Sequence, residues 1–226
     1  NSNSWKKAMT LDEDQFLARL LPRLKQPSTV VVPPGDDCAA VRWRAGELLL
    51  VSVDQVAASV HYHAAESAHP TPPELAGRKL LARNLSDIAA MGGSPLYAVV
   101  ALAWPRTTDS AWAERFMAGI TDLAESHQVA IIGGDIAAGG AAVASLTILG
   151  TVRDDHVCTR HGARAGDIIV VTGAFGGSLE SQRHLTFQPR LDEGRFLAEN
   201  TFTRCLIDVS DGLLKDLSRL GAASHL

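Results

Sequence analysis

Cysteine is scarce in this chain, and its three cysteines form no recognisable pattern. Cys38, Cys158 and Cys205 lie far apart, and none belongs to a Cys-x-x-Cys pair. An odd number of widely spaced cysteines favours neither a disulfide framework nor a zinc site. We therefore expect a protein of the reducing cytoplasm.

Long apolar runs and an excess of positive charge are also missing. No segment approaches the roughly 20 apolar residues of a membrane-spanning helix. Lys6 and Lys7 are not followed by the apolar stretch of a secretion signal. The formal net charge of −4 gives no electrostatic footprint for nucleic acid. We expect neither a membrane nor a nucleic-acid partner.

The common glycine-rich nucleotide motifs are absent as well. No Gly-x-x-x-x-Gly-Lys-Ser/Thr occurs, and the glycines of residues 173–177 lack the lysine that completes such a loop. No Gly-x-Gly-x-x-Gly follows a predicted strand, so a dinucleotide-binding fold has no support. His61 and His63 could offer two imidazoles from one side of a strand, but a bare His-x-His pair without further ligands is common.

Helical and strand patterns alternate along the 226 residues. The predicted helices cover residues 11–24, 74–91 and 110–127 and a segment from about 211, and the predicted strands cover residues 47–53, 96–103, 129–132, 143–152 and 168–171. Residues 181–200 are weakly periodic and stay unassigned. A second unit begins near Arg153, so we expect domains over residues 1–152 and 153–226. The alternation favours an α/β or α+β architecture.

Five acidic motifs stand beside these apolar segments. They are Gly35-Asp36-Asp37, Asp54, Asn84-Leu85-Ser86-Asp87, Gly133-Gly134-Asp135 and Asp208-Val209-Ser210-Asp211-Gly212. Carboxylates are hard oxygen ligands that suit Mg²⁺, which usually keeps coordination positions for water and substrate phosphates. The pattern therefore predicts one magnesium site built from several elements, in an enzyme of phosphoryl transfer.

Each motif also has a purely structural interpretation, which the sequence leaves open. Asp37 can belong to a turn, Asp211 can cap a helix, Asp135 can lie in a tight connection, and Asp87 can pair with Arg83 one turn earlier. Two carboxylates about 4 Å apart repel by roughly 4 kcal/mol at an effective dielectric near 20, so carboxylates that converge need cations.

Several segments in register carry a more specific signal over most of residues 30–222. They are Gly35 to Val41, Val51 to Asp54 with His61-Tyr62, Asn84 to Gly93, Gly133 to Asp135, Thr159-Arg160, Gly166-Asp167 and Ile207 to Leu213. Their order and wording resemble the thiamine-monophosphate kinase family, within the aminoimidazole ribonucleotide synthetase superfamily. The block Asn-Leu-Ser-Asp-Ile-Ala-Ala-Met-Gly that begins at Asn84 is the most specific of them.

The resemblance implies direct transfer of the γ-phosphoryl group of ATP onto the phosphate of thiamine monophosphate, giving thiamine diphosphate and ADP. No phosphoenzyme and no strong general base are expected, because the acceptor oxygen is already ionised. The implied fold pairs an N-terminal α/β domain with a C-terminal α+β domain. The N-terminal sheet joins that of a second copy in a homodimer, and ATP lies close to the dimer interface.

Site residues follow from the same resemblance, position by position. The implied magnesium ligands are Asp37, Ser52, Asp54, Asp87, Asp135, Asp208 and Asp211. Gly134 and Asp135 are expected near ATP, with Arg160 and Ser210 at its phosphates. His61 is expected at the thiamine monophosphate.

The chain departs from the family pattern at a few positions. Val53 and Ile136 stand where threonines are common, and Ala57-Ala58-Ser59 replaces a Val-Glu-Gly type of segment. A later Gly-Gly-Glu-Asp segment and the aromatic residue that holds the thiamine ring are expected after Leu226. Two alternatives therefore stay open: another ATP-dependent enzyme of the superfamily with a different acceptor, and a catalytically silent, dimeric nucleotide-binding relative.

Overall fold

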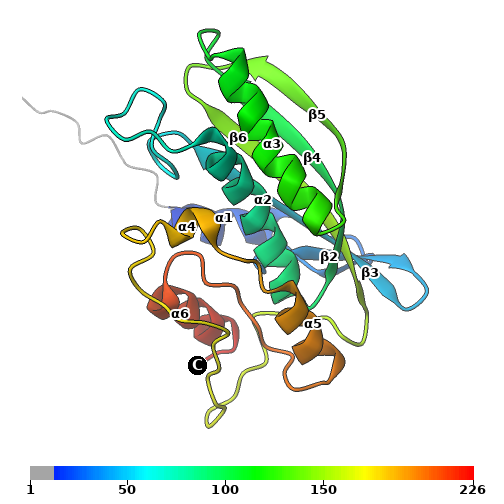
Figure 1. Cartoon of the computed structure of the whole chain (residues 1–226). Coiled ribbons are helices and arrows are strands. Elements are labelled where there is room, and N and C mark those ends of the chain that lie inside the picture. Colours follow the sequence, from blue (N-terminus) through cyan, green and yellow to red (C-terminus); the bar gives the residue numbers. More distant parts are fainter. Residues whose placement is uncertain (1–12) are drawn as a thin grey trace, which may run out of the picture.

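One mixed sheet organises the fold (Figure 1). The computed structural model describes residues 13–226. Within these residues the strand order is β1-β2-β3-β6-β4-β5, and every neighbouring pair is antiparallel except β4 with β5. The strands are β1 (Val30–Val32), β2 (Ala39–Arg44), β3 (Glu47–Ala57), β4 (Ser94–Trp104), β5 (Ala130–Ala138) and β6 (Val143–Arg153).

The two long helices cover one face of this sheet (Figure 1). Of the shorter C-terminal helices, α4 lies beside the N-terminal half of α2 and α5 packs at its C-terminal end. The helices are α1 (Glu13–Leu20), η1 (Leu21–Arg23), α2 (Pro73–Ala90), α3 (Ser110–Ser126), α4 (Arg183–Thr186), α5 (Leu191–Glu199) and α6 (Leu213–Ala223). Within residues 13–226, none of them combines the length and the apolar character that a membrane span requires.

The helix α2 begins and ends where local chemistry predicts. Pro73 lies at its first position, where a missing N–H costs nothing, and residues with high helix propensity follow. The helix stops before Gly92, whose φ of +70° suits glycine, and Gly93 N–H donates to Ile88 O at 3.0 Å. The predicted helix over residues 74–91 is therefore confirmed.

Two glycines let α2 and α3 approach closely. A Cβ on Gly77 would lie 1.9 Å from the Phe116 carbonyl oxygen, and one on Gly119 would lie 1.9 Å from the Glu74 carbonyl oxygen. Beside this crossing, Trp112 stacks on Phe116 with 5.4 Å between the ring centroids. The resulting packing fixes α2 against the sheet, and with it the side chains that α2 carries.

Alternation along the strands gives the sheet two different faces. Leu48, Leu50, Leu146 and Ile148 are buried beneath the helices, on what we call the covered face. The opposite face, which we call the open face, carries half-buried or exposed residues: Val53, Tyr97, Val99, Ala101, Ser145 and Thr147. Ser52 and Asp54 alternate with Val53 and therefore belong to the covered face.

Two strands extend further than the sequence predicts. Strand β3 pairs with β6 as far as Ala57 opposite Val143, so Asp54 lies inside the strand and not at its end as predicted. Strand β5 pairs with β4 as far as Ala138, so Asp135 also lies inside a strand and not after it. Hydrogen bonding to a neighbouring strand sets both lengths, and this information is not local in the sequence.

The remaining differences between prediction and structure lie before β3 and after β6. The predicted strand at residues 168–171 is wrong: these residues are 46% to 87% exposed and pair with no strand of the described chain. Strands β1 and β2 were not predicted, and the unassigned residues 181–200 contain α4 and α5. The predicted helix over residues 11–24 corresponds to α1 and η1, and residues 10–12 of its predicted cap lie outside the described part. A domain boundary at residue 152 stays a prediction.

Candidate functional site

Three carboxylates from distant parts of the sequence meet on the covered side of the fold. Asp37 lies between β1 and β2, Asp87 lies on α2, and Asp208 lies in the segment before α6. One oxygen from each lies within 4.8 Å of the others. We call this group the acidic cluster. It confirms that residues from three of the predicted acidic motifs converge.

Asp37 is held in the acidic cluster by hydrogen bonds to Arg160 and to the neighbouring Asp36. Arg160 Nη2 donates to Asp37 Oδ1 at 2.5 Å, and the Asp37 side chain is fully buried. The backbone N–H groups of Arg160 and Asp37 both donate to Asp36, at 2.9 Å each. The turn around Asp36 therefore binds to the segment that carries Arg160, more than a hundred residues later in the chain.

Two serines orient the other carboxylates of the cluster. Ser52 Oγ on β3 donates to Asp87 Oδ2 at 2.5 Å, and Ser86 Oγ on α2 donates to Asp208 Oδ2 at 2.8 Å. Hydroxyl groups supply these hydrogen bonds without adding positive charge. The two serines therefore orient the carboxylates without neutralising them.

The acidic cluster is electrostatically strained. Burial, together with the charge of Asp208, raises the pKa of Asp37 to about 7 despite the ion pair with Arg160. Burial first, and then the charges of Asp208 and Asp54, raise the pKa of Asp87 to about 9. Burial also raises the pKa of Asp208. Asp37 Oδ2 is buried without a hydrogen-bond partner, so the cluster favours either protons or a bound cation.

Asp54 adjoins the cluster but is engaged by an arginine. Arg83 Nε donates to Asp54 Oδ2 at 2.8 Å, and Arg83 Nη2 donates to Asp54 Oδ1 at 2.9 Å. The sequence suggested Asp87 as the partner of Arg83, because the two residues lie one helical turn apart. The structure instead gives Arg83 a partner on β3.

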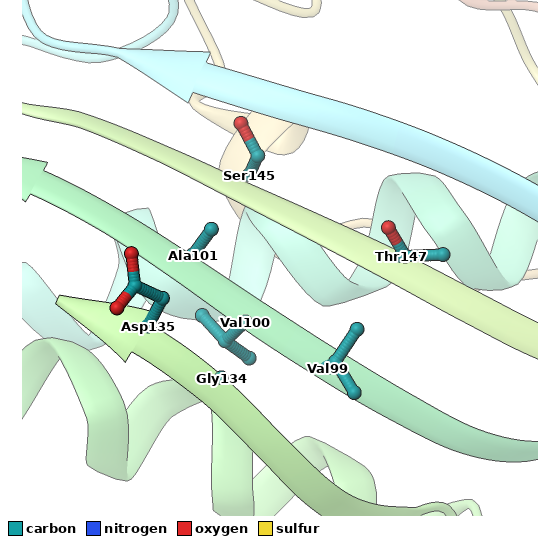
Figure 2. Close-up of a pocket in the computed structure, with 7 residues that line it drawn as sticks. All are labelled: Val99, Val100, Ala101, Gly134, Asp135, Ser145 and Thr147. Carbon is teal, nitrogen blue, oxygen red and sulfur yellow. The ribbon is translucent and has the colours of Figure 1, made fainter.

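Asp135 lies on the open face and does not join the acidic cluster. It stands opposite Ala101 of β4 and lines a hollow of about 200 Å³ with Val99, Ser145 and Thr147. Figure 2 shows these side chains together on the strands, with the helices behind the sheet. The predicted ligand Asp135 is therefore separated from the cluster by the sheet itself.

Asp216, in the first turn of α6, has a structural role that the sequence analysis did not predict. Asp216 is buried, and its Oδ2 accepts the backbone N–H groups of Ser210, Asp211 and Gly212 at 3.0, 2.9 and 3.1 Å. It thereby holds the loop that follows Asp208. The available signal was an aspartate in the first turn of the predicted helix, where a carboxylate can accept N–H groups.

Asp211 itself lies outside the cluster. Its Oδ2 accepts from Lys215 Nζ at 2.7 Å and from Arg219 Nη2 at 2.9 Å. These ion pairs, the one with Lys215 first, lower the pKa of Asp211. The carboxylate is therefore ionised and partly exposed, in contrast to the carboxylates of the cluster.

His61 lies in the turn after β3 and not in a strand. Its Nδ1 accepts the Ala57 N–H at 3.0 Å, and Lys79 Nζ donates to its carbonyl oxygen at 2.7 Å. Burial first, and then the charges of Arg83 and Lys79, lower the pKa of His61. His63 joins no group of metal-ligating side chains among the described residues, so the His-x-His interpretation has no support.

Comparison with known protein families identifies the fold family of this chain. Residues 35–152 match the family model for the N-terminal domain of AIR synthase related proteins. This match confirms the predicted fold class, a mixed α/β fold of the aminoimidazole ribonucleotide synthetase type. The acidic cluster draws Asp37 and Asp87 from within the matched residues and Asp208 from beyond them.

Comparison with individual proteins narrows the family further. A thiamine-monophosphate kinase of Rhodopirellula baltica is 39% identical over 222 residues, which cover 95% of this chain and 68% of the relative. The crystal structure of thiamine monophosphate kinase from Aquifex aeolicus is 26% identical, has a TM-score of 0.74, and is matched over 93% of this chain and 71% of its own. AaThiL complexed with AMPPCP and TMP shows the same fold, with a TM-score of 0.80 at 24% identity over 96% of this chain and 74% of its own. The chain belongs to the thiamine-monophosphate kinase family.

Proposed function

We propose that this chain transfers the γ-phosphoryl group of ATP onto the phosphate of thiamine monophosphate, giving thiamine diphosphate and ADP. The observation that carries the proposal is the convergence of three carboxylates in a chain of this family. A relative of the same fold is complexed with AMPPCP, an analogue of ATP, and with TMP. This pair of ligands supports ATP as the donor and a phosphate monoester as the acceptor.

The acidic cluster fits magnesium. Asp37, Asp87 and Asp208 offer the hard oxygen ligands that Mg²⁺ prefers, and Asp37 Oδ2 has no other partner. A divalent cation also relieves the repulsion that raises the pKa values of these carboxylates. When bound, Mg²⁺ neutralises the phosphates of donor and acceptor. We assign these three residues as ligands of one ion.

The other proposed ligands fall into two groups. Ser52 and Asp54 lie beside the cluster on the covered face, in contact with Asp87 and Arg83. Asp135 lies on the open face, and Asp211 lies in the loop before α6. We propose that Asp135 and Asp211 bind further magnesium ions that arrive with the nucleotide. The family resemblance and the carboxylate chemistry support this assignment.

The nucleotide and the acceptor are assigned to residues around the cluster. Gly134 and Asp135 would contact ATP, while Arg160 and Ser210 would bind its phosphates. Arg160 already pairs with Asp37, so its guanidinium lies where metal and phosphate would meet. His61, with Nδ1 occupied and a lowered pKa, would bind the acceptor as a neutral hydrogen-bonding group.

Direct transfer needs no catalytic acid or base in this chain. An acceptor phosphate is already ionised, so the barrier comes from bringing two anionic groups into line. Arg160 would contribute by positioning these groups and neutralising their charge, and the carboxylates would contribute by holding the magnesium that neutralises them. We therefore assign no general base and expect no phosphoenzyme.

We further propose a homodimer formed through the open face, in the cytoplasm. Val53 is 64% exposed and Tyr97 is 46% exposed on this face, and the edge strand β5 is exposed along most of its length. Exposed apolar side chains on a flat sheet favour burial against a second surface. Residues 153–226 would then form a separate C-terminal domain beside the dimer.

The experiment is an assay of ADP release in Mg·ATP with and without thiamine monophosphate, followed by mass spectrometry of the product. Thiamine diphosphate formation is the expected result. A panel of other phosphate monoesters and carboxylic acids serves as the control for acceptor identity. ADP release with another acceptor would assign the chain a different reaction of the superfamily, and bound nucleotide without turnover would contradict an enzymatic function.

A further inference from the structure

Arg83 on α2 and Asp54 on β3 form an ion pair with two hydrogen bonds. Arg83 Nε and Nη2 each donate to a different oxygen of Asp54, at 2.8 and 2.9 Å. One guanidinium therefore engages both oxygens of a carboxylate. The two side chains are only 28% and 23% exposed, so water and salt screen this pair less than a pair on the surface.

The same arginine acts on the acidic cluster. Burial lowers the pKa of Arg83, but the ion pair with Asp54 and the charges of Asp87 and Asp208 raise it overall. Asp54 in turn is one of the charges that raise the pKa of Asp87 and of Asp208, after burial. Arg83 therefore supplies positive charge beside Asp54, Asp87 and Asp208.

The groups that face Arg83 come from several elements. Asp54 comes from β3, Asp87 from α2 and Asp208 from the segment before α6. His61, in the turn after β3, is close enough for the charge of Arg83 to lower its pKa. Arg83 is thus near both the acidic cluster and the residue assigned to the acceptor.

We propose that Arg83 is a counter-ion that a divalent cation must displace from Asp54, and that Arg83 thereby sets the metal affinity of the site. The inference rests on the metal part of the proposed function. A guanidinium and a metal ion compete for the same carboxylate oxygens, since Arg83 occupies both oxygens of Asp54. Removal of Arg83 should therefore strengthen metal binding, whereas removal of a residue that merely supports the fold should not.

The test is calorimetric titration of Mn²⁺ into the protein without nucleotide or acceptor. Arg83→Gln should lower the Kd for Mn²⁺ by roughly tenfold, because it removes a unit charge within a few ångströms of the ligands. Arg83→Lys keeps the charge but loses the paired geometry, so its Kd should lie between those of wild type and Arg83→Gln. The matched control is Arg115→Gln, which breaks a similar two-bond pair with Glu74 on the surface and should leave the Kd unchanged.

A double-mutant comparison tests whether Arg83 acts through its pairing with Asp54. In an Asp54→Asn background, Arg83→Gln should tighten Mn²⁺ binding clearly less than in the wild-type background, because competition for Asp54 is gone and only the charge of Arg83 near Asp87 and Asp208 still acts. An equal tightening in both backgrounds would contradict displacement from Asp54. Folding of each variant is checked by circular dichroism and its thermal midpoint.

The outcomes separate this inference from the proposed function. If the wild-type chain binds no Mn²⁺, the metal part of the proposed function fails together with the inference. If the wild type binds Mn²⁺ and folded Arg83→Gln binds it no more tightly, the inference alone is overturned. Neither result depends on which acceptor the enzyme uses.

Discussion

The covered and open faces of the sheet offer a ligand very different surroundings. On the covered face, Ser52 and Asp54 meet side chains of α2, next to carboxylates that burial and mutual repulsion have strained. On the open face, Asp135 lines a shallow hollow with Ser145 and Thr147. The covered face thus carries a preformed cluster that favours protons or a bound cation. The open face carries exposed apolar side chains and an exposed edge strand, which a ligand or a second copy of the chain could cover.

The predicted site residues fall into two groups: those that one chain brings together by itself, and those that lie apart from them. Asp37, Asp87 and Asp208 are together before any ligand binds. Asp135 lies on the other face, and the role we propose for it would depend on the nucleotide, its metal ions or a second copy of the chain.

Asp87→Asn should lower turnover by at least about a hundredfold, because it removes a proposed ligand of the magnesium ion that would neutralise the reacting phosphates. Its thermal midpoint without metal should stay the same or rise, since one repelling charge is lost. Thiamine diphosphate formation and differential scanning calorimetry provide the two readouts. Asp122→Asn on the exposed side of α3 is the control, and normal turnover in Asp87→Asn would remove the cluster from the mechanism.

Asp135→Asn should also impair turnover severely, by roughly tenfold to a hundredfold, if Asp135 binds metal with the nucleotide. Because Asp135 lies on the other face, the Kd of the nucleotide-free protein for Mn²⁺ should stay within about twofold of wild type. Calorimetry without nucleotide checks this point. A loss of Mn²⁺ binding as large as that caused by Asp87→Asn would show that the two faces act as one site.

In the metal-free protein, the contribution of Asp87 to stability should fall as the pH rises from about 4 to about 9. The pKa of Asp87 rises from 3.8 to about 9 on folding, so the folded state keeps a proton that the unfolded state has already lost. Stability therefore decreases through this window. Asp87→Asn should flatten the decrease of the thermal midpoint with pH, and saturating Mg²⁺ should reduce it. The same pH dependence of the midpoint in wild type and Asp87→Asn would contradict the raised pKa of Asp87.

Val53→Glu on the open face should separate the proposed dimer with little effect on the fold of one chain. Val53 is 64% exposed, so the stability of the monomer should change by no more than about 0.5 kcal/mol. Analytical ultracentrifugation measures the assembly state. Val60→Glu changes a side chain that is 75% exposed in the turn after β3 and serves as the control. A Val53→Glu protein that dimerises like wild type would exclude the open face as the interface.

The parts of the fold that sequence predicts well are those with local causes. The limits of α2 follow from Pro73, from helix propensity and from Gly92. The extents of β3 and β5 depend on pairing with distant strands, which the sequence does not state. The apolar run at residues 168–171 reads as a strand, but an apolar run becomes a strand only beside a hydrogen-bonded neighbour.

The candidate site shows the same limit. The acidic motifs and the family resemblance identify Asp37, Asp87 and Asp208, but only the fold shows that they converge. The pairing of Arg83 with Asp54 could not be predicted, because helical spacing favours Asp87 as its partner. The face on which Asp135 lies depends on the strand in which it stands, and the sequence placed it after that strand.

The most direct test of the account is anomalous diffraction from crystals of the protein grown with Mn²⁺ and AMPPCP. We expect a Mn²⁺ peak coordinated by carboxylate oxygens of Asp37, Asp87 and Asp208, close to the phosphates of the nucleotide. Bound nucleotide with metal only near Asp135 on the open face, and none at the acidic cluster, would contradict it.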